Sequence, residues 1–254
     1  MEKMIPAILI LCLCLMPVQI QAKSVTSGTD DNGNKWTYNT STKTLTFTGN
    51  KAISDFTLNG HDREPSWYRW SNKTKHIVIE EGITGIGSEA FSSFTETKSI
   101  TMGESVKRIN RMAFWANVSL KEIKLSSNIT VIQGDALSGG RELETIKLPM
   151  RLRKMCSLSG QEKLEKIVMP DSITNMQSAM FSECKKLKYI KLPAKIKEIK
   201  SYDFAGCKKL KKLTIPQSVK TVSMSAFAGS GLKKIVLPEN VTTIKNGDAG
   251  RKVF

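Results

Sequence analysis

The chain has 254 residues, of which 40% are hydrophobic and 24% are charged. This balance is typical of a folded protein with a buried core, and it excludes a mostly disordered chain. The formal net charge of +16 is unusual for such a protein. It predicts attraction to anionic partners, such as nucleic acid, acidic glycans or a membrane surface, without choosing among them.

Residues 1–22 have the pattern of a signal peptide, which predicts a secreted or cell-surface protein. Ile5–Val18 is apolar, and the small Ala22 follows at the expected cleavage point. The apolar run is too short for a good membrane span, although an uncleaved N-terminal anchor is the alternative interpretation. We expect no transmembrane segment elsewhere. Lipidation at Cys12 or Cys14 is not expected, because leucine precedes each cysteine.

Residues 23–75 do not repeat, and they predict an N-terminal β cap. Ser24–Asn34 is rich in small polar residues and predicts a flexible lead-in segment. Lys35–Gly49 predicts a β-hairpin, because apolar residues alternate along both of its halves. These alternating residues are Trp36, Tyr38, Leu45 and Phe47.

Three aromatic residues, Trp67, Tyr68 and Trp70, come shortly before the first repeat. Packing inside the cap is the favoured interpretation, because a cap must shield the first apolar layer of a repeat array. A platform that stacks against a glycan is the alternative.

Residues 76–254 contain an internal repeat of 21–23 residues. The units begin at Ile77, Ile100, Ile123, Ile146, Ile167, Ile190, Leu213 and Ile235. The clearest copy is Ile190–Lys212, and the consensus is I-x-L-P-x-x-I-x-x-I-x-x-x-A-F-x-x-C-x-x-L-x-x. One such unit cannot bury its own apolar residues, so stacked units must share a continuous core.

Each position that recurs among the repeats has a physical role. Apolar residues at positions 1 and 3 alternate as in a strand, with Ile190 and Leu192 as examples. Proline at position 4, as in Pro193, ends the strand because it donates no hydrogen bond. Position 15 is usually phenylalanine, as in Phe204, and predicts a buried ladder through the array.

These repeats resemble the treponemal-type leucine-rich repeat of BspA-like surface proteins from host-associated bacteria. The resemblance covers Ile77 to about Lys245 and implies a leucine-rich repeat solenoid, a right-handed, curved and mainly β array. It also implies adhesion-type roles at the cell surface or outside the cell, with host matrix proteins among the partners. The N-terminal region is similar to the one that precedes the repeats in many such proteins.

Two units depart from the pattern. Ile146–Lys166 is two residues short and lacks the Ala-Phe pair, for which Leu158 is the expected substitute. The last unit has Asp248 and Ala249 where Ala-Phe is expected, and no C-terminal cap or anchor motif follows. We therefore expect the last repeat to be incomplete.

No pattern of catalytic, cofactor-binding or metal-binding residues stands out, so the sequence predicts a protein that is not an enzyme. His61 and His76 have no metal-ligand spacing. Removal of the signal peptide leaves three cysteines, an odd number that argues against a disulfide framework. Cys184 and Cys207 share position 18 and are expected to be buried thiols, with a disulfide between them as the alternative.

The predicted ligand face consists of positions 23 and 2, which flank the inward position 1 and must therefore point out of the sheet. The candidate residues are Lys124, Lys147, Lys166, Tyr189, Lys191, Lys212 and Lys234. A binding surface for an anionic partner is one interpretation of this run. The other is a solvated face whose lysines only keep the array soluble.

The sequence thus predicts a non-enzymatic extracellular or cell-surface binding module that needs no cofactor. The expected partner is a host extracellular or surface protein, or an anionic glycan, and nucleic acid is not expected. The alternative is a structural remnant of a larger repeat protein without binding of its own.

Overall fold

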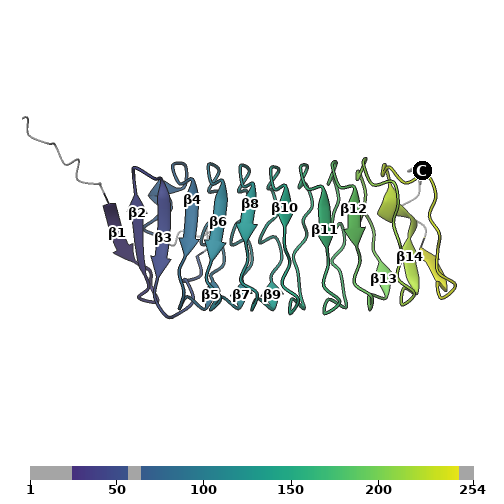
Figure 1. Cartoon of the computed structure of the whole chain (residues 1–254), viewed down its shortest axis with the longest axis horizontal. Helices are drawn as coiled ribbons and strands as arrows, with labels where there is room; N and C mark the ends of the chain where they lie inside the picture. Colours follow the sequence, from purple (N-terminus) through teal and green to yellow (C-terminus); the bar gives the residue numbers. More distant parts are fainter. Residues whose placement is uncertain (1–24, 57–63, 246–254) are drawn as a thin grey trace, which may run out of the picture.

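The computed structural model describes residues 25–56 and 64–245. Over these ranges the chain winds into a solenoid whose turns lie side by side along the long axis of the molecule (Figure 1). It is mainly β, and two 3-10 helices, η1 (Tyr68–Trp70) and η2 (Met224–Phe227), are the helical elements of the described residues. The predicted leucine-rich repeat solenoid is confirmed.

Some sequence predictions fall outside the described residues. These are the signal peptide with Cys12 and Cys14, His61, and the departure at Asp248 and Ala249.

A main sheet of nine strands runs along the array (Figure 1). In spatial order its strands are β1 (Val25–Thr29), β2 (Lys35–Asn39), β3 (Thr44–Thr48), β4 (His76–Ile79), β6 (Ser99–Met102), β8 (Glu122–Lys124), β10 (Thr145–Ile146), β11 (Lys166–Val168) and β12 (Tyr189–Lys191). From β3 onward the pairing is parallel, because each turn of the solenoid brings the chain back in the same direction. Ile77 pairs with Ile100 and Ile100 with Ile123, so the sequence alignment of the repeats is also the strand register.

A second ladder forms at repeat positions 9 and 10, and sequence analysis did not predict it. One piece contains β5 (Gly85–Ile86), β7 (Arg108–Ile109) and β9 (Val131–Ile132), and the other contains β13 (Glu198–Ile199), β14 (Thr221–Ser223) and β15 (Thr243–Lys245). The ladder breaks where position 10 is Met155 and then Met176 instead of isoleucine or valine. β-Branched side chains favour extended backbone more than methionine does, which explains the break.

The predicted ladder at position 15 lies in the core. Phe181 stacks on Phe204 with ring centroids 5.9 Å apart, and Phe204 stacks on Phe227 at the same distance. The amide of Leu158 donates to the carbonyl of Met180 at 2.8 Å, as the amide of Phe181 does to Asp203 one turn later. Leu158 therefore takes the phenylalanine position in the short repeat, as predicted.

A second internal ladder connects position 18 to the position 15 carbonyl of the preceding turn. The thiol of Cys184 donates to the carbonyl of Leu158 at 3.2 Å, and the thiol of Cys207 donates to that of Phe181 at 3.1 Å. Asn117 and Gln161 make the same contact with their amides, to Phe91 and Leu137, both at 2.9 Å. The cysteines are buried and unpaired, which confirms the expected free thiols.

The cap contains one strand more than predicted. The expected hairpin is present as β2 and β3, and its four alternating apolar residues are buried. The prediction that Ser24–Asn34 is a flexible segment is wrong for its described part, because β1 pairs with β2 in an antiparallel register. A tight turn between the two strands makes this pairing possible. In this turn the Asp30 carboxylate accepts a hydrogen bond from the backbone N–H of Asn34 at 2.7 Å and another from the side-chain amide of Asn34 at 2.9 Å.

The other end of the described array leaves apolar residues exposed. Leu237 and Ile244 occupy the inward positions 3 and 10 of the last repeat, yet they are 36% and 52% exposed. In the earlier turns these positions are buried, apart from the partly buried Leu125, so this end is the least buried part of the described core.

Candidate functional site

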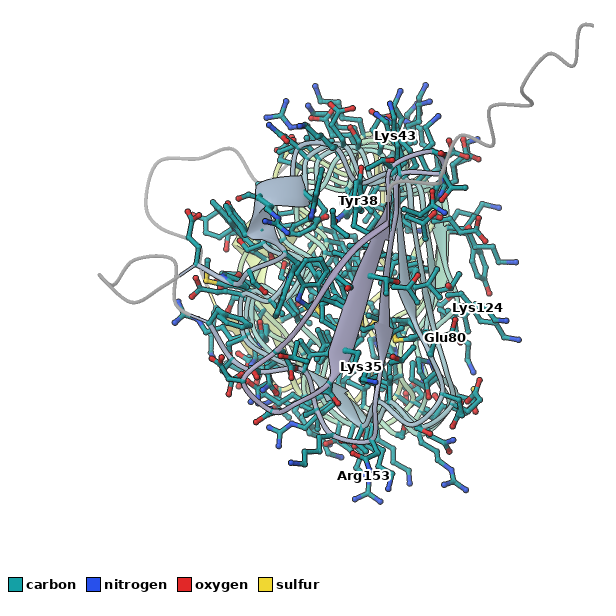
Figure 2. All side chains as sticks on the ribbon, turned by 90° about the vertical axis from the view of Figure 1, so that its left-hand side faces the viewer. Lys35, Tyr38, Lys43, Glu80, Lys124 and Arg153 are labelled. Atoms are coloured by element: carbon teal, nitrogen blue, oxygen red, sulfur yellow. The ribbon has the colours of Figure 1, made fainter. Side chains whose placement is uncertain are left out.

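The predicted ligand residues lie on the outer surface of the main sheet, which we call the sheet face. In β8, β11 and β12 the central residue is buried and both of its neighbours are exposed, because successive side chains of a strand point to opposite sides. All seven predicted residues are exposed, namely Lys124, Lys147, Lys166, Tyr189, Lys191, Lys212 and Lys234. Figure 2 looks along the array from its N-terminal end and shows Lys124 pointing away from the core. The role of these residues in binding stays a prediction.

The main sheet does not carry the whole run of lysines. Its last strand is β12, so Lys212 and Lys234 lie on turns that add no strand to this sheet. The hydrogen-bonded ladder of the last turns is instead on the other side of the repeat, in β13, β14 and β15. The expectation that the lysines cross one continuous sheet as far as Lys234 is therefore wrong, although the residues are exposed on adjacent turns.

Charge is concentrated in one half of the sheet face. From β3 to β6 the outward residues are uncharged, and they include Thr46, Val78 and Thr101. From β8 onward each turn contributes a lysine, and Glu122 is the acidic residue of this half among the described sheet-face positions. Neighbouring strands lie about 4.8 Å apart, so these ammonium groups raise the potential of one continuous surface.

The neighbours of each lysine decide how much of its charge is available. Lys191 is partly neutralised, because its Nζ lies 3.5 Å from a carboxylate oxygen of Asp171. The pKa of Asp171 is lowered first by the hydrogen bond from the Ala194 amide and then by the charge of Lys191. Lys166 instead lies over the ring of Tyr189, with 5.2 Å between its Nζ and the ring centroid. This contact leaves the ammonium positive and open to an anion.

A hollow of about 540 Å³ lies at the edge of the sheet face between the third and fourth repeats. We call it the basic hollow. Its basic residues are Lys124, Lys147 and Arg151, and its apolar residues include Leu125, Leu148 and Met150. None of the three basic side chains has an ion pair within the described part of the chain. The hollow thus combines three available positive charges with an apolar wall.

Local backbone chemistry explains why the basic hollow forms there. In the first two repeats, position 4 donates a backbone hydrogen bond to the previous turn, from Glu80 to Phe47 and from Gly103 to Ile79. Ser126 in the third repeat donates no such bond to a backbone carbonyl, and Pro149 in the fourth repeat cannot donate one. Strand pairing between β8 and β10 also stops at Ile146. The two turns are no longer joined beyond that point, which leaves room between them.

The acidic residue of the basic hollow is already occupied. Glu104 accepts hydrogen bonds from the amide and the hydroxyl of Ser127, at 2.8 and 2.6 Å. These bonds lower the pKa of Glu104 most, and the charge of Lys124 lowers it further. Glu104 is therefore held as a carboxylate against the turn wall, and it does not cancel the charge of Lys147 or Arg151.

Other candidate residues have structural roles. Trp67 is buried against Phe47 and Phe91, and its indole donates to the carbonyl of Ala90 at 2.9 Å, as expected for cap packing. His76 contacts the hydroxyl of Ser99 at 2.8 Å. Within the described residues, no group of three histidine, cysteine or carboxylate side chains is placed to hold a metal ion.

Sequence reasoning missed the basic hollow with Arg151 and Met150. The available signal was the first proline at position 4, followed directly by Met150, which is 75% exposed. An exposed apolar residue that is close in sequence to basic residues, here Lys147 and Arg151, is a usable indication of a surface site.

Comparison with known proteins places the chain in a family. Six copies of the BspA-type leucine-rich repeat region match it, over residues 64–159 and 157–248. The chain belongs to the BspA-type leucine-rich repeat family. No curated protein matches the sequence. The predicted resemblance is confirmed.

Solved structures of other leucine-rich repeat proteins share this BspA-type fold. A leucine-rich repeat protein from Bacteroides ovatus ATCC 8483 is 24% identical, with a TM-score of 0.67, and the match covers 87% of this chain and 59% of that protein. The leucine-rich repeat protein of T. pallidum is 20% identical, with a TM-score of 0.58 over 82% of this chain and 87% of that one. The chain thus spans 59% of the length of the B. ovatus protein. At these identities the likeness shows the fold.

The described part of this BspA-type chain contains no helix that is long and apolar enough to cross a membrane.

Proposed function

We propose that this protein is an exported, non-enzymatic binding module of a host-associated bacterium, and that its sheet face binds an acidic surface of a host extracellular or cell-surface protein. The observation that carries the proposal is the basic half of the sheet face, where Lys124, Lys147 and Lys166 lie on consecutive turns without a carboxylate partner in the described residues. Membership of the BspA-type family supports it.

The composition of the sheet face favours a protein partner. Tyr189 is 50% exposed and Val168 is 44% exposed, and both lie in the middle of the basic half. Met150 adds a third exposed apolar side chain, in the basic hollow at the edge of the sheet face. Tyrosine at the centre of a surface, with polar and charged groups around it, is the arrangement that protein interfaces use for their energetically dominant contacts.

Long-range attraction should govern association at this surface. A basic surface raises the association rate of an acidic partner, and salt weakens this attraction because the Debye length falls to about 8 Å at physiological ionic strength. We therefore expect affinity to fall as salt rises, with most of the loss in the association rate.

A charge-matched pair of variants tests the site. The sheet-face variant changes Lys124, Lys147 and Lys166 to glutamine. The control variant makes the same change at Lys107, Lys197 and Lys220, which are exposed and precede strands of the second ladder. Surface plasmon resonance against immobilised host matrix proteins, at several salt concentrations, measures binding. We expect at least about a tenfold loss for the sheet-face variant, equivalent to about 1.4 kcal/mol, and less than half of that free-energy change for the control.

A third variant separates contact from charge. Tyr189→Ala leaves the net charge unchanged, and we expect it to weaken binding by about 1–2 kcal/mol, as loss of a central tyrosine usually does. If the two lysine triple variants lose the same binding affinity and Tyr189→Ala has no effect, the attraction depends on net charge alone. That result would refute the proposed site. Absence of binding to every matrix protein at low salt would favour the alternative of a structural remnant.

A further inference from the structure

A second hollow lies on the N-terminal cap, away from the sheet face, and has a volume of about 530 Å³. We call it the cap hollow. The residues that matter for its chemistry are Tyr38, Lys43, Trp70, Asn72, Lys73 and Lys75. Figure 2 shows Tyr38 and Lys43 together toward one end of the cross-section, whereas Lys124 points out of the sheet face.

Two aromatic rings form one wall of the cap hollow. Tyr38 stacks on Trp70 with ring centroids 4.2 Å apart and an angle of 16° between the planes. The indole of Trp70 is half-buried, and its N–H has no acceptor among the described residues. Tyr38 is buried and covers one face of the Trp70 indole, so the wall offers the edge and the other face of Trp70, over which exposed basic side chains lie. That suits one saturated ring better than a row of stacked bases.

Basic side chains from three segments surround this wall. Lys43 comes from the turn between β2 and β3, and Lys73 and Lys75 come from the segment between η1 and β4. Lys73 and Arg69 lie over the indole of Trp70, with 5.6 and 5.5 Å from their charged groups to the ring centroid. Two positive groups therefore lie over the indole, and Lys43 and Lys75 add further positive charge to the lining of the hollow.

One carboxylate balances them in part. Glu96 forms an ion pair with Lys75. Its pKa is lowered first by the hydrogen bond from Lys75, and then by the charges of Lys75, Lys98 and Lys43. Lys43 and Lys73 have no ion pair among the described residues. The cap hollow thus has an excess of positive charge that a second anion would relieve.

The backbone holds these groups in place. The amide of Lys75 donates to the carbonyl of Lys43 at 2.8 Å, and the hydroxyl of Tyr38 donates to the carbonyl of Lys73 at 3.3 Å. The amide of Thr74 donates to the carbonyl of Trp70 at 2.9 Å. The hollow is therefore built on hydrogen-bonded backbone and not on loose side chains alone, which lowers the entropic cost of binding.

We propose that the cap hollow binds an acidic sugar residue of an oligosaccharide. On binding, the exposed side chains of Arg69 and Lys73 move off the indole, and the apolar face of the sugar ring takes their place against Trp70. The carboxylate or sulfate of the sugar pairs with Lys43 and Lys73, and the amide of Asn72 hydrogen-bonds a ring hydroxyl. Cations for the acid group, an aromatic surface for the ring carbons and an amide for the hydroxyls are the three chemistries that such a ligand needs. This site is independent of the sheet face.

Isothermal titration calorimetry with trigalacturonate as the probe tests the proposal, with its methyl ester as the uncharged analogue. We expect the wild-type chain to bind the acid and to bind the ester at least about tenfold more weakly. Changing Lys43 and Lys73 to glutamine should weaken binding of the acid by about the same factor. Trp70→Phe should weaken it less, because the stack on Tyr38 is kept.

Two matched controls distinguish the cap hollow from other surfaces. Changing Lys197 and Lys220 to glutamine removes the same charge from the second-ladder side, and the sheet-face variant removes charge from the main sheet; both should retain wild-type affinity for trigalacturonate. Equal binding of the ester, an equal loss in the Lys197 and Lys220 variant, or absence of binding would overturn the proposal. A loss confined to the sheet-face variant would overturn it too and move the sugar site to the sheet face.

Discussion

Asp203 is a residue whose side chain conflicts with its position in the repeat. It occupies position 14, where the consensus has alanine and where Ala113 and Ala226 stand in other turns. Its side chain is fully buried and accepts hydrogen bonds from the amides of Lys200 at 2.7 Å and Met180 at 3.3 Å. Loss of solvation outweighs these bonds and raises the pKa of Asp203 to about 7. The folded chain thus keeps a proton that the unfolded chain gives up near pH 4.

This raised pKa predicts a pH-dependent loss of stability. As pH rises from 5 to 8 the unfolded chain has already released the Asp203 proton, whereas the folded chain releases it only near pH 7. The contribution of Asp203 to the free energy of unfolding should therefore fall by about 2–3 kcal/mol over this interval and level off above it. Denaturant unfolding of the parent and of Asp203→Asn at several pH values measures the effect. The stability of the variant relative to the parent should increase by that amount between pH 5 and 8.

Asp171 provides the control for this measurement. It is only partly buried and its pKa is lowered, so both states of the chain are ionised at this residue above pH 5. Asp171→Asn should differ from the parent by a constant amount across the same interval. A constant difference for Asp203→Asn as well would show that Asp203 is ionised in the folded chain.

At the scale of the element, the position 18 ladder supplies hydrogen bonds that the sheets do not. Asn117, Gln161, Cys184 and Cys207 each donate to a backbone carbonyl one turn back. The carbonyls belong to the buried position 15 residues, of which Leu158 and Phe181 also accept the backbone amide of the residue three positions later. Asparagine, glutamine and cysteine can therefore replace one another at position 18, because each side chain fits in the core and donates one hydrogen bond to the carbonyl.

Removal of one donor from this ladder should be costly. We expect Gln161→Ala to lower the free energy of unfolding by about 1–3 kcal/mol, because the carbonyl of Leu137 would be left buried without a partner. Chemical denaturation followed by circular dichroism measures the change. Gln217→Ala, at an exposed position, should cost less than about 0.5 kcal/mol. Similar values for the two variants would show that water replaces the missing amide.

The main sheet has its weakest connection at β10. This strand has two residues and pairs with β11 through Thr145 and Lys166 alone. The short repeat and the first proline at position 4 both fall at this place, and the basic hollow opens beside it. One local change in the repeat thus creates a surface feature that regular turns do not have.

At the scale of the whole molecule, positive charge is spread over several sides of the array. Figure 2 shows Lys43, Lys124 and Arg153 pointing in three different directions from the core. The ion pairs among described residues are on the surface and contribute little each. With a net charge of +16, repulsion among lysines should therefore oppose folding at low ionic strength.

Salt should accordingly stabilise the unbound protein. An increase in sodium chloride from 0.01 to 0.15 M shortens the Debye length from about 30 to about 8 Å. We expect the Tm, measured by differential scanning calorimetry, to rise by about 2–4 °C, which corresponds to about 1 kcal/mol for a chain of this size. Sucrose at equal osmolarity controls for effects other than screening. A lower Tm at 0.15 M would mean that surface ion pairs outweigh the repulsion.

The sequence by itself determined the solenoid, the length and register of its turns, the inward residues and the hairpin of the cap. It could do so because the repeat places the same chemistry at the same position many times, and one stacked arrangement satisfies every copy. The substitution of Leu158 for phenylalanine and the exposure of the sheet-face lysines follow from the same register.

The tertiary structure alone decided what depends on neighbouring turns. The second ladder, the pairing of β1 with β2, and the end of the main sheet at β12 all rest on which hydrogen bonds form between neighbouring segments. The same is true of the two hollows. The basic hollow depends on a missing hydrogen bond between turns, and the cap hollow brings Lys43 next to Lys73 and Trp70 from distant parts of the sequence. Sequence periodicity fixes which way a side chain points, whereas only packing between turns fixes which side chains meet.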